Sequence, residues 1–234
     1  DLHKEYRRQR QMCIRDSVKI HNYRADNGTF RAKAFIDDCT AKDQRVTFCG
    51  VGAHWQNGVA ERHIRTIVER ARTVLLHASA QWPDDTIETE LWTFALNHCV
   101  QQWNKTPCPE LNNLTPDEVF TGITERENHV LDIDNDFHPF GCPVYVLKSK
   151  LQDNKTIPKW DSRMRTGVFL GHSKMHARNV ALVMNTKTMN ISPQYHVIFD
   201  DKFQTLDSKL KDVDKIKIWE GISKRALADN TSAL

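Results

Sequence analysis

The sequence predicts an α/β protein in which a region of helices and short strands precedes a small β-rich module. In residues 57–79, apolar side chains recur at alternating three- and four-residue steps, which is the spacing of an amphipathic helix. After Cys142 the period changes, and runs rich in β-forming residues alternate with polar turns. Several short strands of this kind are typical of a small antiparallel sheet or barrel.

Two predicted strands flank a predicted helix in the first fifty residues of the sequence. The run 18–23 predicts a strand that ends at Asp26, where Asn27-Gly28 supplies a turn. Residues 30–39 have helical spacing, and residues 45–49 predict a second strand because they are rich in β-formers.

The clearest predicted element is a helix from about Asn57 to Ser79. Its apolar stripe consists of Ile64, Ile67, Ala71, Val74 and Ala78. Glu61 precedes the stripe by one turn, so we expect its carboxylate to face the sheet rather than open water. The positive end of the helix dipole favours an ionised carboxylate at this position.

Further helices are predicted after Pro83, ending near Trp103, and after Thr115. The β-type runs beyond them are 144–147, 167–170, 180–184 and 195–199. The predicted domain organisation is an atypical segment 1–17, a core 18–121, an acidic linker 122–138, a β-rich module 139–205 and a charged tail 206–234. The segment 1–17 has no stable period, and we interpret it as a sequence not native to the gene rather than as a fraying helix.

Charge, hydropathy and cysteine spacing bear on three kinds of function: nucleic-acid binding, membrane insertion and zinc binding. Residues 141–205 carry ten Lys and Arg against four Asp and Glu, which suits a nucleic-acid partner, although a solvated surface explains these charges nearly as well. No apolar run approaches the length of a membrane span. The six cysteines form no CxxC pair, which argues against a zinc site and is typical of free thiols inside the cell.

Asp26 and Glu61 are the candidate catalytic residues and metal ligands. Carboxylates at a strand end and at a helix start can share a divalent cation, and the hard oxygen ligands suit Mg²⁺ or Mn²⁺. Such a site supports phosphoryl transfer between DNA strands. Each motif also has an ordinary explanation, because Asp-Asn-Gly is a common turn and a Glu in a first helical turn is a common capping residue.

Two sets of motifs resemble the integrases of copia-type LTR retrotransposons, within the retroviral integrase and RNase H-like group. The turn at residues 26–28 and the run Gln-Asn-Gly-Val-Ala-Glu-Arg at residues 56–62 are similar to the last two acids of the integrase core. Residues 140–142, 167–173 and 196–200 resemble the segment that follows that core. The resemblance covers roughly residues 18–203.

This resemblance implies a partial RNase H-like core and a parent enzyme that processes DNA ends and joins them to target DNA. It also implies a homo-oligomeric parent that acts on chromosomal DNA in the nucleus. The family's first Asp should lie upstream of Asp26, and only Asp1 and Asp16 precede it, in a different context. The family's N-terminal His-His-Cys-Cys zinc module is also absent. We therefore expect no strand transfer by this chain alone.

Two alternatives stay open. The chain is either a non-catalytic remnant of an integrase that binds nucleic acid, or an interaction protein in which the two acids are structural. For DNA contact we expect Gln56, Asn57, Arg62 and Arg65 near Glu61, and Lys148, Lys150, Lys159 and Arg163 in the β-rich module, with Lys155 and Arg165 alongside.

Overall fold

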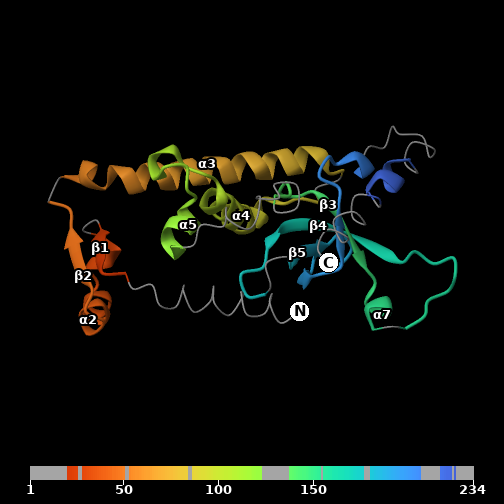
Figure 1. Ribbon diagram of the computed structural model, residues 1–234, viewed down its shortest axis with the longest axis horizontal. Helices are drawn as coiled ribbons and strands as arrows, with labels where there is room; N and C mark the ends of the chain where they lie inside the picture. Colours follow the sequence, from red (N-terminus) through yellow and green to blue (C-terminus); the bar gives the residue numbers. More distant parts are fainter. Residues whose placement is uncertain are drawn as a thin grey trace. The chain divides into compact units, whose positions relative to one another are not determined.

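A computed structural model describes residues 20–25, 28–50, 53–83, 86–122, 137–153, 155–176, 180–206, 217–222 and 224. The predicted segment 1–17 lies outside these residues, as do most of the acidic linker and most of the charged tail. The described elements are a mixture of helices and strands (Figure 1). They belong to two compact units, one within Asp1–Glu69 and Pro107–Thr124, the other within Arg70–Thr106 and Glu125–Leu234. The boundary therefore falls inside a helix and inside the predicted core.

The first unit contains a short parallel strand pair. Strand β1 (Asn22–Ala25) pairs with β2 (Arg45–Phe48), and helix α2 (Lys33–Ala41) connects them after the 3₁₀ turn η1 (Thr29–Arg31). The Tyr23 ring meets the Phe35 ring edge-on at 5.6 Å, which packs the helix onto the strand. The predicted strand–helix–strand order is confirmed, with both the first strand and the helix beginning later than expected.

Helix α3 (Gly58–Gln81) is the longest described element and follows the 3₁₀ helix η2 (His54–Asn57). Its predicted apolar stripe is only partly buried, because Ala71 and Ala78 are buried whereas Ile64 is 63% exposed. The first turns of α3 are open to solvent, and Glu61 is exposed with them. The expectation that Glu61 faces the sheet is therefore wrong.

A short helix also belongs to the first unit. The 3₁₀ turn η4 (Pro109–Leu111) leads to α5 (Pro116–Thr121), as the Thr-Pro signal predicts. Thr115 Oγ1 accepts from the Glu118 backbone N–H, and the Glu118 carboxylate accepts from the Thr115 backbone N–H. This reciprocal capping box satisfies two backbone donors at the start of α5.

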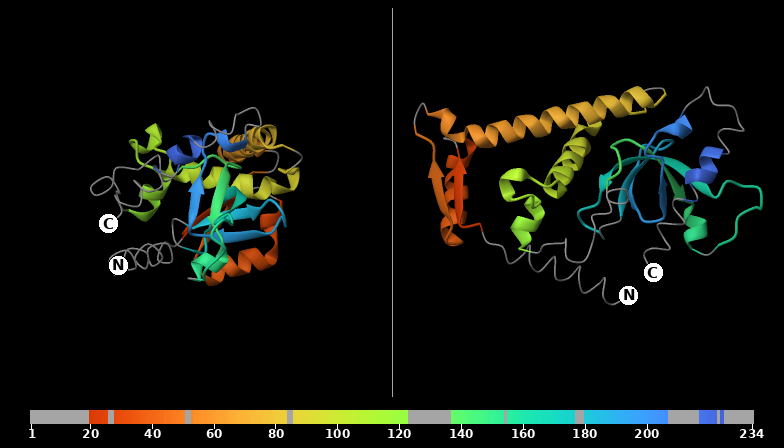
Figure 2. Two further views of the ribbon diagram at one scale, coloured as in Figure 1. Left: turned by 90° about the vertical axis from the view of Figure 1, so that its right-hand side faces the viewer. Right: turned by 45° about the horizontal axis from the view of Figure 1, so that its top comes forward.

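The second unit is built on a five-stranded antiparallel sheet with the strand order β6-β5-β4-β3-β7 (Figures 1 and 2). The strands are β3 (Pro143–Leu147), β4 (Met164–His172), β5 (Ala181–Asn185), β6 (Ile191–Gln194) and β7 (Val197–Phe199). Strand β6 was not predicted. It carries Pro193, which lacks a backbone donor and is tolerated here because β6 is an edge strand.

One hydrophobic cluster of the second unit is centred on strands β3, β4 and β5. Its buried members are Cys142, Val144, Val146, Phe169, Ala181, Val183 and Phe203. Helix α4 (Trp92–Lys105), which follows η3 (Thr89–Leu91), lies against β4, and the Gln101 side-chain amide donates to the His172 carbonyl at 3.1 Å. The sheet unit therefore includes helical residues that the sequence assigned to the core domain.

Smaller elements complete the second unit. Helix α7 (Ser149–Gln152) and the 3₁₀ turn η6 (Gln204–Leu206) follow β3 and β7. Residues 217–222 are helical, and the Trp219 ring meets the Tyr145 ring at 4.1 Å. Within the described ranges, no helix combines the length and the apolar character that crossing a membrane requires.

Replacing Gly167 with Ala tests how closely β4 and β5 approach. An added Cβ would lie 2.4 Å from Val183 Cγ1 and 2.9 Å from the Met184 carbonyl oxygen, so the strands would have to separate. Overpacking of this kind costs about 1–3 kcal/mol, and we expect Gly167→Ala to lower the free energy of unfolding in urea by that amount.

Gly58→Ala is the matched control. Gly58 has a helical φ of −59°, and nothing lies within 4 Å of an added Cβ. This variant should be as stable as the unmodified chain or slightly more stable. Equal unfolding curves for the two variants would contradict the close approach of β4 and β5.

Candidate metal site and nucleic-acid interface

In the first unit, each of the two predicted acids follows, in sequence, the carboxyl end of one strand of a parallel pair. In the parallel register Ala25 lies opposite Phe48, so both strands have their carboxyl ends at the same edge. Asp26 follows Ala25 in sequence, and the segment leading to Glu61 follows Phe48. In sheets of this kind, ligands bind beside the carboxyl ends of the parallel strands. Asp26 itself lies outside the described residues.

The start of helix α3 is held by a side-chain hydrogen bond. Gln56 Oε1 accepts from the Gly50 backbone N–H at 3.1 Å, which ties η2 back to the end of β2. Glu61 stands in the first turn of α3 with its side chain exposed to solvent. Carboxylate oxygens are hard ligands of the kind that Mg²⁺ and Mn²⁺ prefer.

The described residues offer Glu61 as a single ligand of this predicted site. Across the part of the chain that the structure describes, no group of three or more His, Cys, Asp or Glu side chains is placed to hold a metal ion. One exposed carboxylate at a helix start fits a divalent cation as one ligand among several, with Asp26 expected to supply another.

The four predicted DNA-contacting residues of the first unit differ in their exposure and in their hydrogen bonds. Gln56 and Asn57 are half-buried, and the Gln56 carbonyl oxygen is already engaged by Gly50. Arg62 and Arg65 are exposed. Because Arg65 lies four residues after Glu61, it shares a face of α3 with the carboxylate. The arginines are therefore the better placed of the four for a phosphate.

In the second unit, the predicted basic residues lie along one connection, residues 148–163 between β3 and β4. Lys148 is half-buried, and Lys150, Lys159 and Arg163 are exposed. The ends of the connection are joined, since the Lys148 N–H donates to the Arg163 carbonyl at 3.0 Å. These four cations therefore belong to one anchored surface segment, which we call the basic connection.

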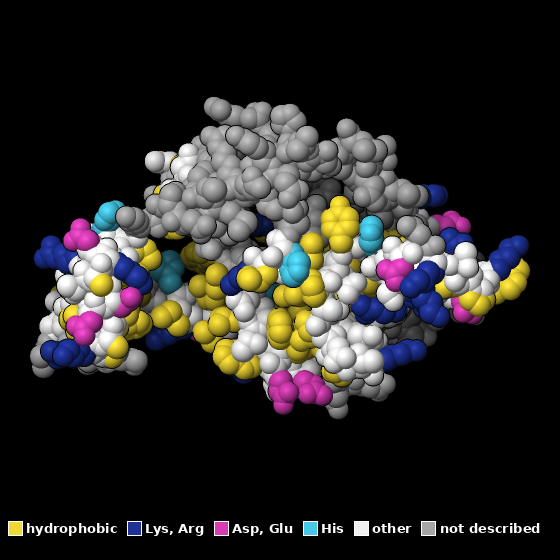
Figure 3. Space-filling view, turned by 90° about the horizontal axis from the view of Figure 1, so that it is seen from below, with side chains coloured by type: hydrophobic (Ala, Val, Ile, Leu, Met, Phe, Trp, Pro, Cys, Tyr) yellow, Lys and Arg dark blue, Asp and Glu magenta, His cyan; other side chains and the backbone are white. Residues whose placement is uncertain are grey.

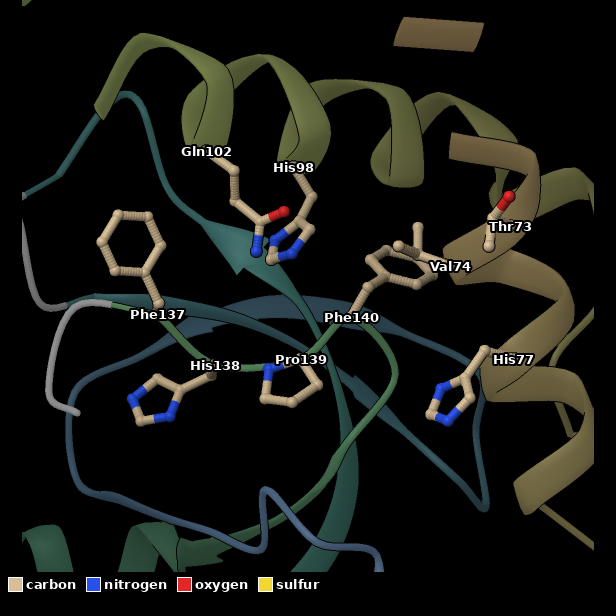
Figure 4. A pocket seen from close by; sticks show the side chains of 9 residues that line it. All are labelled: Thr73, Val74, His77, His98, Gln102, Phe137, His138, Pro139 and Phe140. Carbon is tan, nitrogen blue, oxygen red and sulfur yellow. The ribbon is translucent and has the colours of Figure 1, made fainter. Parts of the chain in front are cut away.

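A separate pocket of about 400 Å³ lies between α3, α4 and the segment before β3 (Figure 4). His98 is 4% exposed, and its Nε2 has no hydrogen-bond partner within the described part of the chain. His138 donates from Nδ1 to Asp201 Oδ1 at 2.9 Å and stacks on the Phe199 ring. Burial, with a smaller contribution from His138, lowers the pKa of His98 to about 4. His98 is therefore neutral at pH 7, and this pocket is mostly aromatic and apolar.

No protein-family model matches the chain. The Retrovirus-related Pol polyprotein from transposon RE1 of Arabidopsis thaliana is 30% identical over 145 residues, which make up 62% of this chain and 8% of that protein. The Retrovirus-related Pol polyprotein from transposon TNT 1-94 of Nicotiana tabacum is 28% identical over 145 residues, or 60% of this chain and 10% of that protein.

The chain therefore spans about a tenth of the length of the curated relatives that it matches. These similarities support the expectation of a region from a retrotransposon polyprotein. They do not specify which activity of such a polyprotein the region carries.

Replacing His98 with Leu tests the buried imidazole. Above pH 6.5 the group is neutral in both the folded and the unfolded chain. As the pH falls from 6.5 towards 4, the unfolded chain binds a proton that the folded chain does not, so stability is lost. The full loss is roughly 3 kcal/mol.

We expect His98→Leu to remove this part of the pH dependence, measured by urea unfolding at several pH values. Leu also changes the packing against Phe140 and Phe169. The resulting change in the free energy of unfolding is the same at every pH, so it does not alter the pH dependence. Identical pH dependence in the two proteins would contradict the buried neutral imidazole.

Proposed function

We propose that this chain is part of a retroelement integrase, with a partial RNase H-like core in the first unit and a DNA-binding β-rich module in the second. The observation that carries the proposal is the parallel pair of β1 and β2, whose carboxyl ends precede Asp26 and the helix of Glu61. Two Pol polyproteins of plant transposons are similar to this chain over 145 residues, which supports the retroelement origin in this proposal.

In this proposal Asp26 and Glu61 hold Mg²⁺ or Mn²⁺ through their carboxylate oxygens. The bound cation would offset the negative charge that develops on a phosphate under attack. Arg62 and Arg65, exposed on the same helix, contact the neighbouring backbone phosphates and fix the position of the DNA strand. Gln56 positions the start of α3 through its hydrogen bond to Gly50.

The basic connection of the second unit contributes sequence-independent affinity. Lysine and arginine side chains bind DNA by displacing counterions from phosphates, so the affinity falls as salt rises. The partners of the intact parent are then its own DNA ends, the target DNA and further copies of the same protein, acting in the nucleus.

A second function is a binding module without catalysis. The exposed basic connection favours it, because that surface does not depend on the two acids. The two functions differ in what Glu61 does, and they agree on DNA as the partner.

Titration of Mn²⁺ into the 234-residue chain, followed by water-proton relaxation, tests the metal site. We expect Glu61→Gln to weaken Mn²⁺ binding about tenfold or more, because it removes a charged ligand. Glu69→Gln makes the same change two turns further along α3 and should bind Mn²⁺ like the unmodified chain. Equal Mn²⁺ affinity in the Glu61 and Glu69 variants would remove Glu61 from the site and favour the binding module.

Salt dependence of binding to a short duplex DNA tests the basic connection. The double variant Lys159→Gln/Arg163→Gln should lower the slope of log K against log salt by about two, since each phosphate contact contributes about 0.9. The control Lys187→Gln/Lys202→Gln removes two exposed charges from other parts of the second unit. If both doubles change the slope equally, the basic connection has no special role.

A further inference from the structure

A second pocket lies at the base of the basic connection, within the second unit. Its volume is about 440 Å³, and its lining includes Lys148, Lys150, Gln152, Asp161, Arg165 and Gln194. These residues come from α7 and its N-cap, the loop that follows α7, and strands β4 and β6. Three cations and one carboxylate therefore face the pocket, so its charge is positive at neutral pH.

Arg165 is the unusual member of this lining. It lies on β4 opposite Val146 of β3 and is half-buried. Its Nη1 is buried and has no hydrogen-bond partner among the residues that the structure describes. Burial lowers the pKa of Arg165 from its ordinary value, although a guanidinium stays protonated at neutral pH.

An unpaired buried N–H of a cation is costly, and native structures almost always provide such groups with a partner. The groups that best match a guanidinium are carboxylate and phosphate, which accept two parallel hydrogen bonds from it. The one carboxylate in the lining, Asp161, forms no ion pair with Arg165 in the described part of the chain.

The frame of the pocket is held by hydrogen bonds that do not involve the charged groups. Gln152 Nε2 donates to the Leu147 carbonyl at 2.7 Å, and the Lys155 N–H donates to the Lys150 carbonyl at 2.8 Å. The Lys148 N–H also donates to the Arg163 carbonyl directly before β4, so this backbone is held beside the start of that strand. An anion would enter a pocket that is already formed.

We propose that this pocket binds a backbone phosphate of a polynucleotide, with Arg165 as the central ligand and Lys148 and Lys150 beside it. The choice of a polynucleotide over free phosphate rests on the proposed function. It is also supported by Trp160, which is 91% exposed, stands directly before Asp161 in sequence and has Lys159 Nζ 5.6 Å from its ring centroid. Cations beside an exposed aromatic ring are typical of surfaces that bind nucleic-acid strands.

The surface around the pocket agrees with this choice of partner. Several Lys and Arg side chains lie over the region of α7 and the basic connection (Figure 3). From Lys148 to Arg165, with both ends included, the sequence carries six Lys and Arg against two Asp, one of which, Asp153, pairs with Lys155 at 3.4 Å. A strand whose phosphate occupied the pocket would find further cations on both sides.

The test is fluorescence anisotropy of a labelled single-stranded DNA with the full 234-residue chain, in EDTA and without divalent cations. We expect Arg165→Gln to weaken binding about tenfold or more, as for a lost hydrogen bond to a charged group. The salt slope should also fall by about one. Lys187→Gln makes the same charge change at an exposed position outside the pocket and is the matched control.

Two further variants keep the test decisive if Arg165→Gln folds poorly. Lys150→Gln alters an exposed side chain at the pocket and should weaken binding in the same direction, whereas Arg165→Lys should bind with intermediate affinity. Binding by Arg165→Gln and Lys150→Gln that equals binding by Lys187→Gln overturns the proposal.

Inorganic phosphate distinguishes the two sources of the anion. If calorimetry detects phosphate binding that Arg165→Gln abolishes while DNA affinity stays unchanged, the pocket takes free phosphate and the polynucleotide assignment is wrong. The DNA assay is carried out in EDTA and without divalent cations, whereas the metal site is followed by Mn²⁺ titration. Failure of the metal site and failure of the phosphate pocket are therefore seen in different measurements.

Discussion

The second unit depends on the corner formed by Phe140, Gly141 and Cys142. The Gly141 N–H donates to the Phe169 carbonyl, the Phe169 N–H donates to the Cys142 carbonyl, and Trp82 Nε1 donates to the Gly141 carbonyl at 2.7 Å. Gly141 has a φ of +77°, and an added Cβ would lie 2.3 Å from Ala78 Cβ. Only glycine allows the end of α3, the start of β3 and the middle of β4 to meet here.

The two ends of strand β4 differ in how deeply their residues are buried. Its residues 167–171 are buried in the sheet, whereas Met164–Thr166 are half-buried. The buried part fixes the register with β3 and β5 and carries Phe169 into the core. Because the register is fixed, the position of Arg165 beside α7 is fixed as well. The core thus fixes the strand that carries Arg165, and the connection between β3 and β4 supplies most of the remaining lining of the pocket.

The sequence predicts the elements well where pattern and burial agree. The β-formers of 144–147 and 167–170 and the stripe through Ala71 and Ala78 are all found in regular structure. Burial was mispredicted at Ile64 because periodicity gives the direction of a helical face but not how far along the helix the covering elements extend. Strand β6 was missed because Pro193 argues against a strand unless the strand is known to be an edge. The half-buried state of Arg165 follows from pairing across strands, which no local pattern encodes.

The two units differ in the number of their paired strands and in the extent of their buried cores. In the first unit, β1 and β2 form a two-stranded pair in which Ala25 is the one buried strand residue among those described, and isolated pairs of this size are marginal in water. The second unit has five paired strands and a continuous buried cluster. Mutations that loosen the first unit are therefore expected to disturb the start of α3 around Glu61 without disturbing Arg165. The proposed metal site and the proposed phosphate pocket are therefore expected to respond to different mutations, because they belong to different units.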